Sequence, residues 1–141
     1  MDILLLIASI SLIVQIVTLS IVISGYILKR KMQFRNHGIL MLVAIIMQFI
    51  SFLLIMGPAF LSLAENGLIQ KPIWVSTVTI VHAGLGGVVL AIGIWISASW
   101  HLRTSIDPCI KKKWIMRYLI IAWISALILG ITLYALLYLI Q

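Results

Sequence analysis

Charged residues are scarce in this chain of 141 residues and make up 9% of the total. Soluble domains carry about 25% charged residues, so this composition excludes an ordinary soluble protein. Only three acids are present, Asp2, Glu65 and Asp107, and none lies within a long apolar run. Because ion-coupled transporters and proton pumps usually carry ionisable groups inside the membrane, the sequence argues against a channel, carrier or pump built from this chain alone.

Most sequence signals of catalysis are also missing. The single cysteine, Cys109, can form neither an internal disulfide nor a C-x-x-C-H haem attachment site. The chain has no Ser-His-acid or Cys-His set, no phosphate-binding loop and no H-E-x-x-H motif. Any chemistry performed by this protein must therefore come from its three histidines.

Long uncharged runs dominate the sequence, and its mean hydropathy is +1.26. Four runs lack Asp, Glu, Lys and Arg: residues 3–28, 36–64, 72–102 and 118–141. A helix needs about 20 mostly apolar residues to cross a bilayer. We therefore predict an all-α integral membrane protein, an antiparallel four-helix bundle that forms a single domain over residues 1–141. Its helices are expected near 3–28, 38–63, 73–100 and 115–139.

The ten Lys and Arg residues are distributed unevenly between the predicted connections. The first holds Lys29, Arg30, Lys31 and Arg35, the second only Lys71, and the third Arg103, Lys111, Lys112, Lys113 and Arg117. Short loops rich in Lys and Arg stay in the cytoplasm. We therefore predict a multi-pass protein of the cell membrane with loops one and three inside and both termini outside (N-out/C-out). The net charge of +7 also favours contact with anionic lipid headgroups, and no nucleic-acid partner is expected.

The three histidines lie at different depths of this predicted bundle. His37 begins the second helix and His101 ends the third, both at the inner face. His82 lies roughly 13 Å below the outer boundary, a depth at which an ionisable residue is a functional hypothesis by default. Its helix face carries small residues, Gly86 among them, because steps of three and four residues share a face. That face could accept a neighbouring helix or a haem with His82 as axial ligand. Alternatively, a Ser or Gln side chain could hydrogen-bond a buried His82.

Two ligand pairings are open at this point. Met56, in "IMGPAF", reaches about the depth of His82, so its thioether could bind opposite His82 or simply pack. His37 and His101 lie at one depth and could flank a single haem near the cytoplasmic face, leaving His82 for a second site. His82 and His101 cannot share a metal because they are about 28 Å apart along one helix.

The segments "HGILM" at 37–41 and "VHAGLGG" at 81–87 carry a family resemblance. They resemble the core of transmembrane b-type cytochromes that pass electrons between ascorbate or quinol and acceptors across a membrane. The chain also resembles a family of small four-helix membrane proteins of unknown function that includes oxidase-assembly proteins of Gram-positive bacteria. The resemblance covers roughly residues 35–139 and implies that His37, His82 and His101 are functional, with haem b as the cofactor. The cytochromes have four core histidines, and here there are three.

The expected function is that of a small haem b-binding electron-transfer protein, a cytochrome b or a redox subunit of a respiratory complex. The candidate metal ligands are His82, His37 and His101, and Met56 and Gly86 are further candidate cofactor-binding residues. The expected partners are the lipid bilayer, other membrane subunits and a quinol. The alternative is a cofactor-free accessory or assembly subunit of a larger oxidase-type complex.

Overall fold

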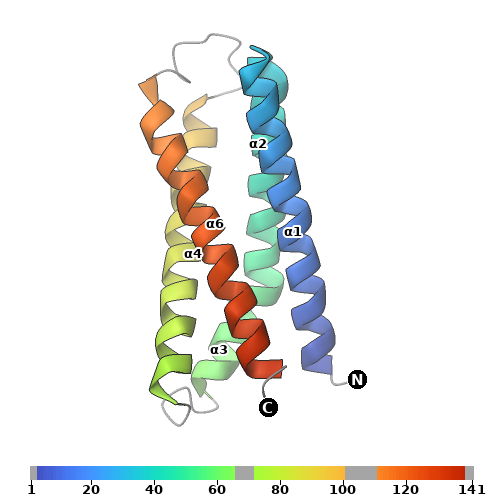
Figure 1. Cartoon of the computed structure of the whole chain (residues 1–141), viewed down its shortest axis with the longest axis vertical. Coiled ribbons are helices and arrows are strands. Elements are labelled where there is room, and N and C mark those ends of the chain that lie inside the picture. Colours follow the sequence, from blue (N-terminus) through green and yellow to red (C-terminus); the bar gives the residue numbers. More distant parts are fainter. Residues whose placement is uncertain (1–2, 66–71, 101–110, 139–141) are drawn as a thin grey trace.

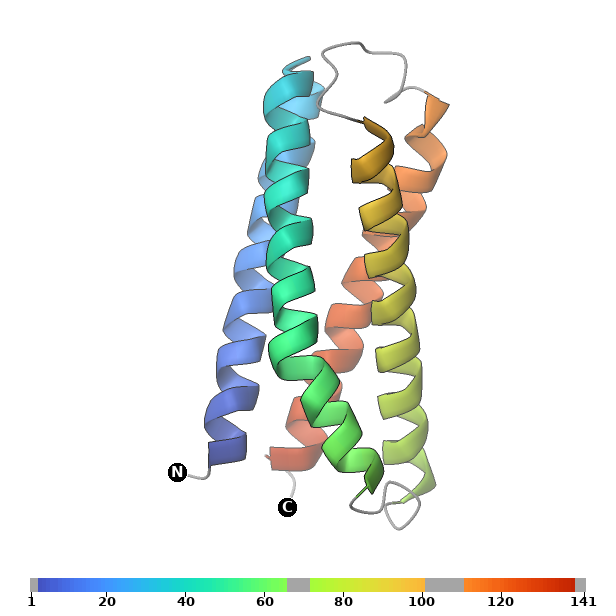
Figure 2. The same cartoon turned by 180° about the vertical axis from the view of Figure 1, so that it is seen from behind.

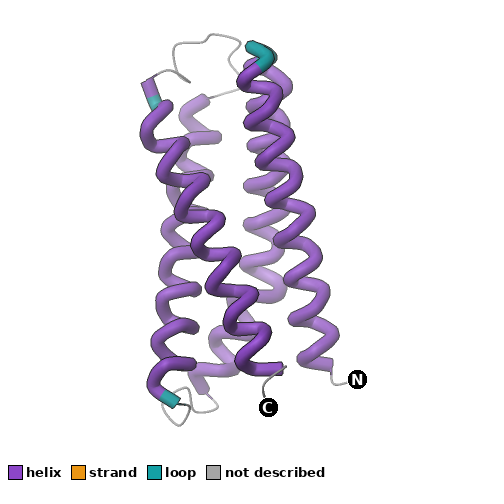
Figure 3. The backbone as a smooth tube through the Cα atoms, in the orientation of Figure 1, coloured by secondary structure: helices purple, strands orange, loops and turns teal. Residues whose placement is uncertain are grey.

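A computed structural model describes residues 3–65, 72–100 and 111–138 (Figure 1). Its elements are α1 (Ile3–Arg30), α2 (Phe34–Ser51), the π-helical segment η1 (Phe52–Met56), α3 (Gly57–Glu65), α4 (Ile73–Trp100) and α6 (Lys113–Tyr138). The described part of the chain contains helices and short turns but no strand (Figure 3). The predicted all-helical fold class is therefore confirmed.

Four helical stretches are long and apolar enough to cross a membrane. They are Leu5–Arg30, Phe34–Ser62, Ile73–Ser99 and Lys113–Leu136. These stretches match the four predicted helices, although three of them extend by a few residues into the basic connections. The extension has a physical reason, because Lys and Arg are good helix formers and their long side chains reach the polar headgroup region from a helix end.

The bundle consists of two helix pairs. α1 packs mainly on α2, and α4 mainly on α6, while contacts between the two pairs are less extensive. Both chain ends lie at one end of the bundle, and the α1–α2 turn lies at the other (Figure 1). One core layer joins the pairs and takes one residue from each long helix: Val22, Ala44, Val89 and Trp123. The seam between the pairs is thus closed at this layer.

A tight turn connects α1 to α2. Met32 adopts the left-handed conformation, with φ of 61°. The Met32 N–H donates to the Lys29 carbonyl and the Gln33 N–H to the Leu28 carbonyl, both at 3.0 Å. This pair of bonds is the Schellman arrangement that ends many helices. Because the turn is so short, the first turn of α2 lies against the last turns of α1.

The second membrane-spanning stretch is interrupted before Pro58. Proline has no N–H to donate and its ring clashes with the carbonyl four residues earlier, and the chain forms the wider π turn η1 directly before it. The interruption therefore has a local cause in Pro58. Beyond η1, α3 bends away from α1 toward α4 (Figure 2). At this end of the bundle α1 instead contacts α6, where the Ser9 and Tyr134 hydroxyls are 3.0 Å apart.

Candidate cofactor site

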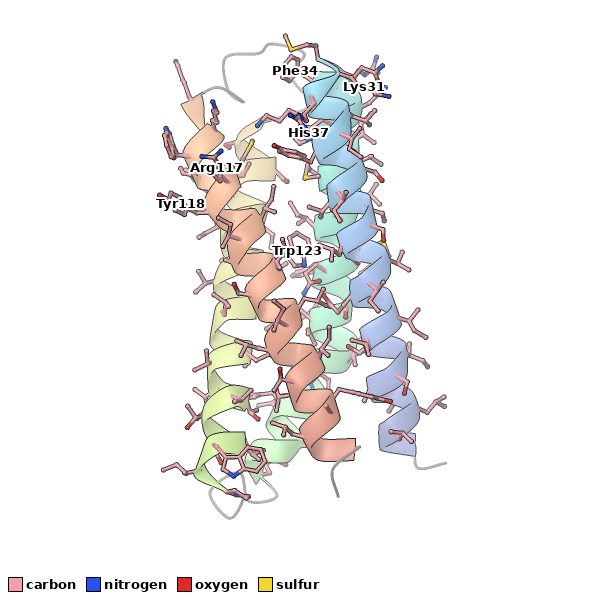
Figure 4. All side chains as sticks on the ribbon, viewed as in Figure 1. Lys31, Phe34, His37, Arg117, Tyr118 and Trp123 are labelled. Carbon is pink, nitrogen blue, oxygen red and sulfur yellow. The ribbon has the colours of Figure 1, made fainter. Side chains whose placement is uncertain are left out.

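A cavity of about 440 Å³ lies between the two helix pairs, in the half of the bundle that holds the α1–α2 turn. Its walls come from all four long helices and are mostly apolar. Val22 and Trp123 of the core layer line its inner end. Figure 4 shows His37 and Trp123 pointing into the space between the pairs, whereas Tyr118 points away from it. Small-molecule sites in proteins usually enclose about 300–1,000 Å³, so this cavity has the size of a cofactor site.

His37 is the imidazole of this cavity, and a hydrogen bond holds its ring in place. Nδ1 lies 2.8 Å from the backbone carbonyl oxygen of Gly25 on α1. A carbonyl can only accept, so Nδ1–H donates, and Nε2 of the neutral ring keeps its lone pair. No described residue forms a hydrogen bond with Nε2. Metal-binding histidines are oriented in this manner, with one ring nitrogen bonded to protein and the other toward the metal.

Gly25 of α1 lies against Met41 and His37 of α2. A Cβ at this position would overlap the Met41 Cε atom and would lie 3.6 Å from His37 Nδ1. The absence of a side chain at Gly25 therefore makes room for the Met41 methyl group, whereas a Cβ would be in ordinary contact with the imidazole. Gly25 was not predicted from the sequence. The feature that could have identified it is an isolated glycine in an otherwise apolar helix that is followed by a short connection.

His82 is held by the same kind of bond in the other helix pair. Its Nδ1–H donates to the Ala126 carbonyl of α6 over 2.9 Å. Its ring lies against Gly130, where a Cβ would come within 3.0 Å of Cε1. The partner of His82 is thus a backbone carbonyl, not the Ser or Gln side chain considered from the sequence. His82 does not line the cavity.

Two other predicted cofactor residues, Met56 and Gly86, do not line this cavity. The Met56 sulfur is 4.0 Å from Gln15 Nε2 of α1. Gly86 has no atom within 4 Å of the position a Cβ would take. His101 falls outside the described residues. Of the two predicted pairings, His82 with Met56 lies outside this cavity, and His37 with His101 stays a prediction.

Two thioethers contribute to the cavity walls, Met41 from α2 and Met116 from α6. Sulfur of methionine is one of the axial ligands that haem iron accepts. Sequence reasoning missed Met116 because it lies in "KKKWIMRY", a segment typical of a membrane boundary. Its spacing of seven residues from Trp123 places both on one face of α6, and this was the available signal.

The described residues contain no group of three or more His, Cys, Asp or Glu side chains that could enclose a metal ion. Haem needs only one side chain at each axial position, and the cavity offers an oriented imidazole, thioethers and apolar walls. The residues present therefore fit a haem. Comparisons with protein-family models, with curated proteins and with solved structures found no match for this chain.

Proposed function

We propose that this protein binds one haem b in the cavity and transfers electrons within the membrane, by itself or as the redox subunit of a respiratory complex. The observation that carries the proposal is the hydrogen bonding of His37. Its Nδ1 proton is committed to the Gly25 carbonyl, so Nε2 is the free nitrogen of a ring that lines the cavity. This is the tautomer that axial ligation of haem requires. The resemblance of "HGILM" to the cytochromes supports the same assignment.

In this proposal each residue of the site has a separate role. His37 would bind the iron, and the Gly25 carbonyl holds its ring and accepts its Nδ1 proton. Met116, from the opposite helix pair, is the candidate for the sixth ligand. The alternative is His101, which the sequence places at the same end of the bundle. Haem b supplies an iron that alternates between the ferric and ferrous states, and a thioether ligand would raise its reduction potential.

The proposed arrangement in the membrane is four antiparallel spans of the cell membrane with the cavity in the cytoplasmic half. The support is the cluster of Lys and Arg at the end of the bundle that holds the cavity. Electrons would then come from a quinol in the bilayer or from a partner subunit. A membrane-impermeant maleimide should label Cys109 in inside-out vesicles and not in intact cells. Labelling in intact cells would contradict this orientation.

An absorption spectrum of the purified protein tests the haem assignment. We expect a Soret band and sharp reduced-minus-oxidised bands, either as isolated or after haem is added. His37→Ala should abolish them because it removes the axial nitrogen. His82→Ala is the matched control, since it removes the same side chain and the same kind of backbone bond outside the cavity. If the wild type binds no haem, the proposed function is wrong. If His37→Ala binds haem as the wild type does, His37 is not the ligand.

A second candidate function is a cofactor-free accessory subunit of a larger membrane complex. The observation that favours it is the open surface beside Gly84, Gly86 and Gly87 of α4, where no atom lies within 4 Å of the Cβ positions. Small residues allow another transmembrane helix to approach closely. A stable, colourless protein that copurifies with oxidase subunits, and loses them on Gly86→Leu, would support this candidate.

A further inference from the structure

The cavity also carries a positive charge. Three basic side chains line it, Lys29 from α1 and Lys113 and Arg117 from α6. No Asp or Glu is among its described lining residues. Glu65, the one acid in the described part of the chain, ends α3 at the opposite end of the bundle (Figure 1). Among the described residues of its walls, the cations of the cavity therefore have no acidic partner.

These cations lie at one end of the cavity and the apolar core layer at the other. On α6, Lys113 and Arg117 are four residues apart and share a face. Trp123 follows six residues after Arg117, which is roughly 9 Å further along the helix. On α1, Lys29 lies one turn beyond Gly25, whose carbonyl holds His37. From its mouth inward, the cavity thus presents cations, then the imidazole, then an apolar floor.

We propose that Lys29, Lys113 and Arg117 bind the carboxylates of the haem, and this inference rests on the proposed function. Haem is a flat apolar ring with both of its acid groups on one edge, so its chemistry matches a cavity with an imidazole in the wall and cations at one end only. Lys and Arg form charge-assisted hydrogen bonds with carboxylates. The positive-inside rule explains basic residues at this end of the bundle, but it does not require that three of them line the cavity. The haem therefore lies with its acidic edge toward the α1–α2 turn.

The test compares two porphyrins that differ only in their acid groups. Purified full-length protein in a neutral detergent is titrated with ferric haem and with its dimethyl ester, and binding is followed at the Soret band. We expect haem to bind at least roughly tenfold more tightly than the ester, the size of one charge-assisted contact. Added salt should weaken binding of haem more than binding of the ester, because it screens charges.

A charge-matched pair of variants isolates the role of the three residues. The triple variant Lys29→Gln, Lys113→Gln, Arg117→Gln should bind haem and ester alike. The control is Arg30→Gln, Lys31→Gln, Lys111→Gln, which removes the same charge from exposed residues at the same end of the bundle and outside the cavity. The control should retain the preference for haem. Circular dichroism verifies that both variants keep their helices.

The outcomes separate this inference from the proposed function. If the wild type binds haem and ester equally, the inference is overturned while haem binding stands. If the wild type binds neither haem nor ester, the proposed function is wrong, and the inference that rests on it is wrong as well. If labelled phosphatidylglycerol, but not phosphatidylcholine, requires these three residues and the haem preference is absent, the cations serve a lipid phosphate and the carboxylate assignment is overturned.

Discussion

The contact between His82 and Gly130 predicts an unusual response to a common substitution. Replacing glycine by alanine inside a helix normally stabilises a protein by roughly 0.5–1 kcal/mol. At Gly130, however, a Cβ would lie 3.0 Å from Cε1 of His82, 3.6 Å from Nδ1 and 3.7 Å from Nε2. Carbon atoms in good contact are about 3.5–4.0 Å apart. The imidazole would therefore have to move by a few tenths of an ångström.

The ring has little freedom to make this movement. Its Nδ1–H donates to the Ala126 carbonyl over 2.9 Å, and Ala126 lies one turn from Gly130 on the same face of α6. A shift of a few tenths of an ångström would stretch the N···O distance to about 3.2 Å, the upper end of normal N–H···O bonds. Overpacking of this kind costs about 1–3 kcal/mol. After subtraction of the helix-propensity gain, Gly130→Ala should destabilise the protein by about 1 kcal/mol.

The sign of this effect should reverse when the ring is absent. In a His82→Ala background, Gly130→Ala should stabilise the protein by roughly 0.5–1 kcal/mol. The assay is the free energy of unfolding in mixed micelles titrated with sodium dodecyl sulfate and followed by circular dichroism. Gly84→Ala is the control, because nothing lies within 4 Å of its Cβ position, and its effect should be the same in both backgrounds. The reasoning is refuted if Gly130→Ala stabilises the wild-type protein by the same amount as it stabilises the His82→Ala variant.

Three further substitutions have defined outcomes. Met116→Leu should leave the haem bound through His37 but lower its reduction potential in a redox titration; an unchanged potential would exclude Met116 as a ligand. Met32→Gly should raise the free energy of unfolding by about 1 kcal/mol, because a left-handed conformation strains any residue with a Cβ; a decrease would contradict the turn geometry. Gln48 buries Oε1 without a partner among the described residues, so Gln48→Leu should stabilise by about 1 kcal/mol. Marked destabilisation would instead indicate that a ligand or another subunit binds the amide.

Much of the fold was predictable because the membrane restricts the choices. A backbone in hydrocarbon must satisfy its own hydrogen bonds, and a long apolar run does so as a helix. The interruption near Pro58 was predictable for a similar local reason, the missing N–H. The exact helix ends were not, since the basic residues that flank α1 and α6 suit a helix and a headgroup region equally well.

The candidate site was predictable only in part. His37 could be named from its residue type, its depth and the glycine that follows it. The cavity could not be predicted. His37 and Met116 line the same cavity only because of the way the two helix pairs pack against each other. Helical periodicity shows which residues share a face of one helix, but it does not show how two helix pairs pack against each other.

The sequence by itself determined the number of helices, their lengths and the uneven placement of basic residues, since each of these follows from local composition. Only the tertiary structure decided what each histidine does. Gly25 and the tight turn at Met32 bring a carbonyl to His37, whereas the partner of His82 lies 44 residues away, at Ala126. The physical reason is that two imidazoles with the same kind of Nδ1 bond differ in whether they line the cavity, and the cavity walls come from all four long helices.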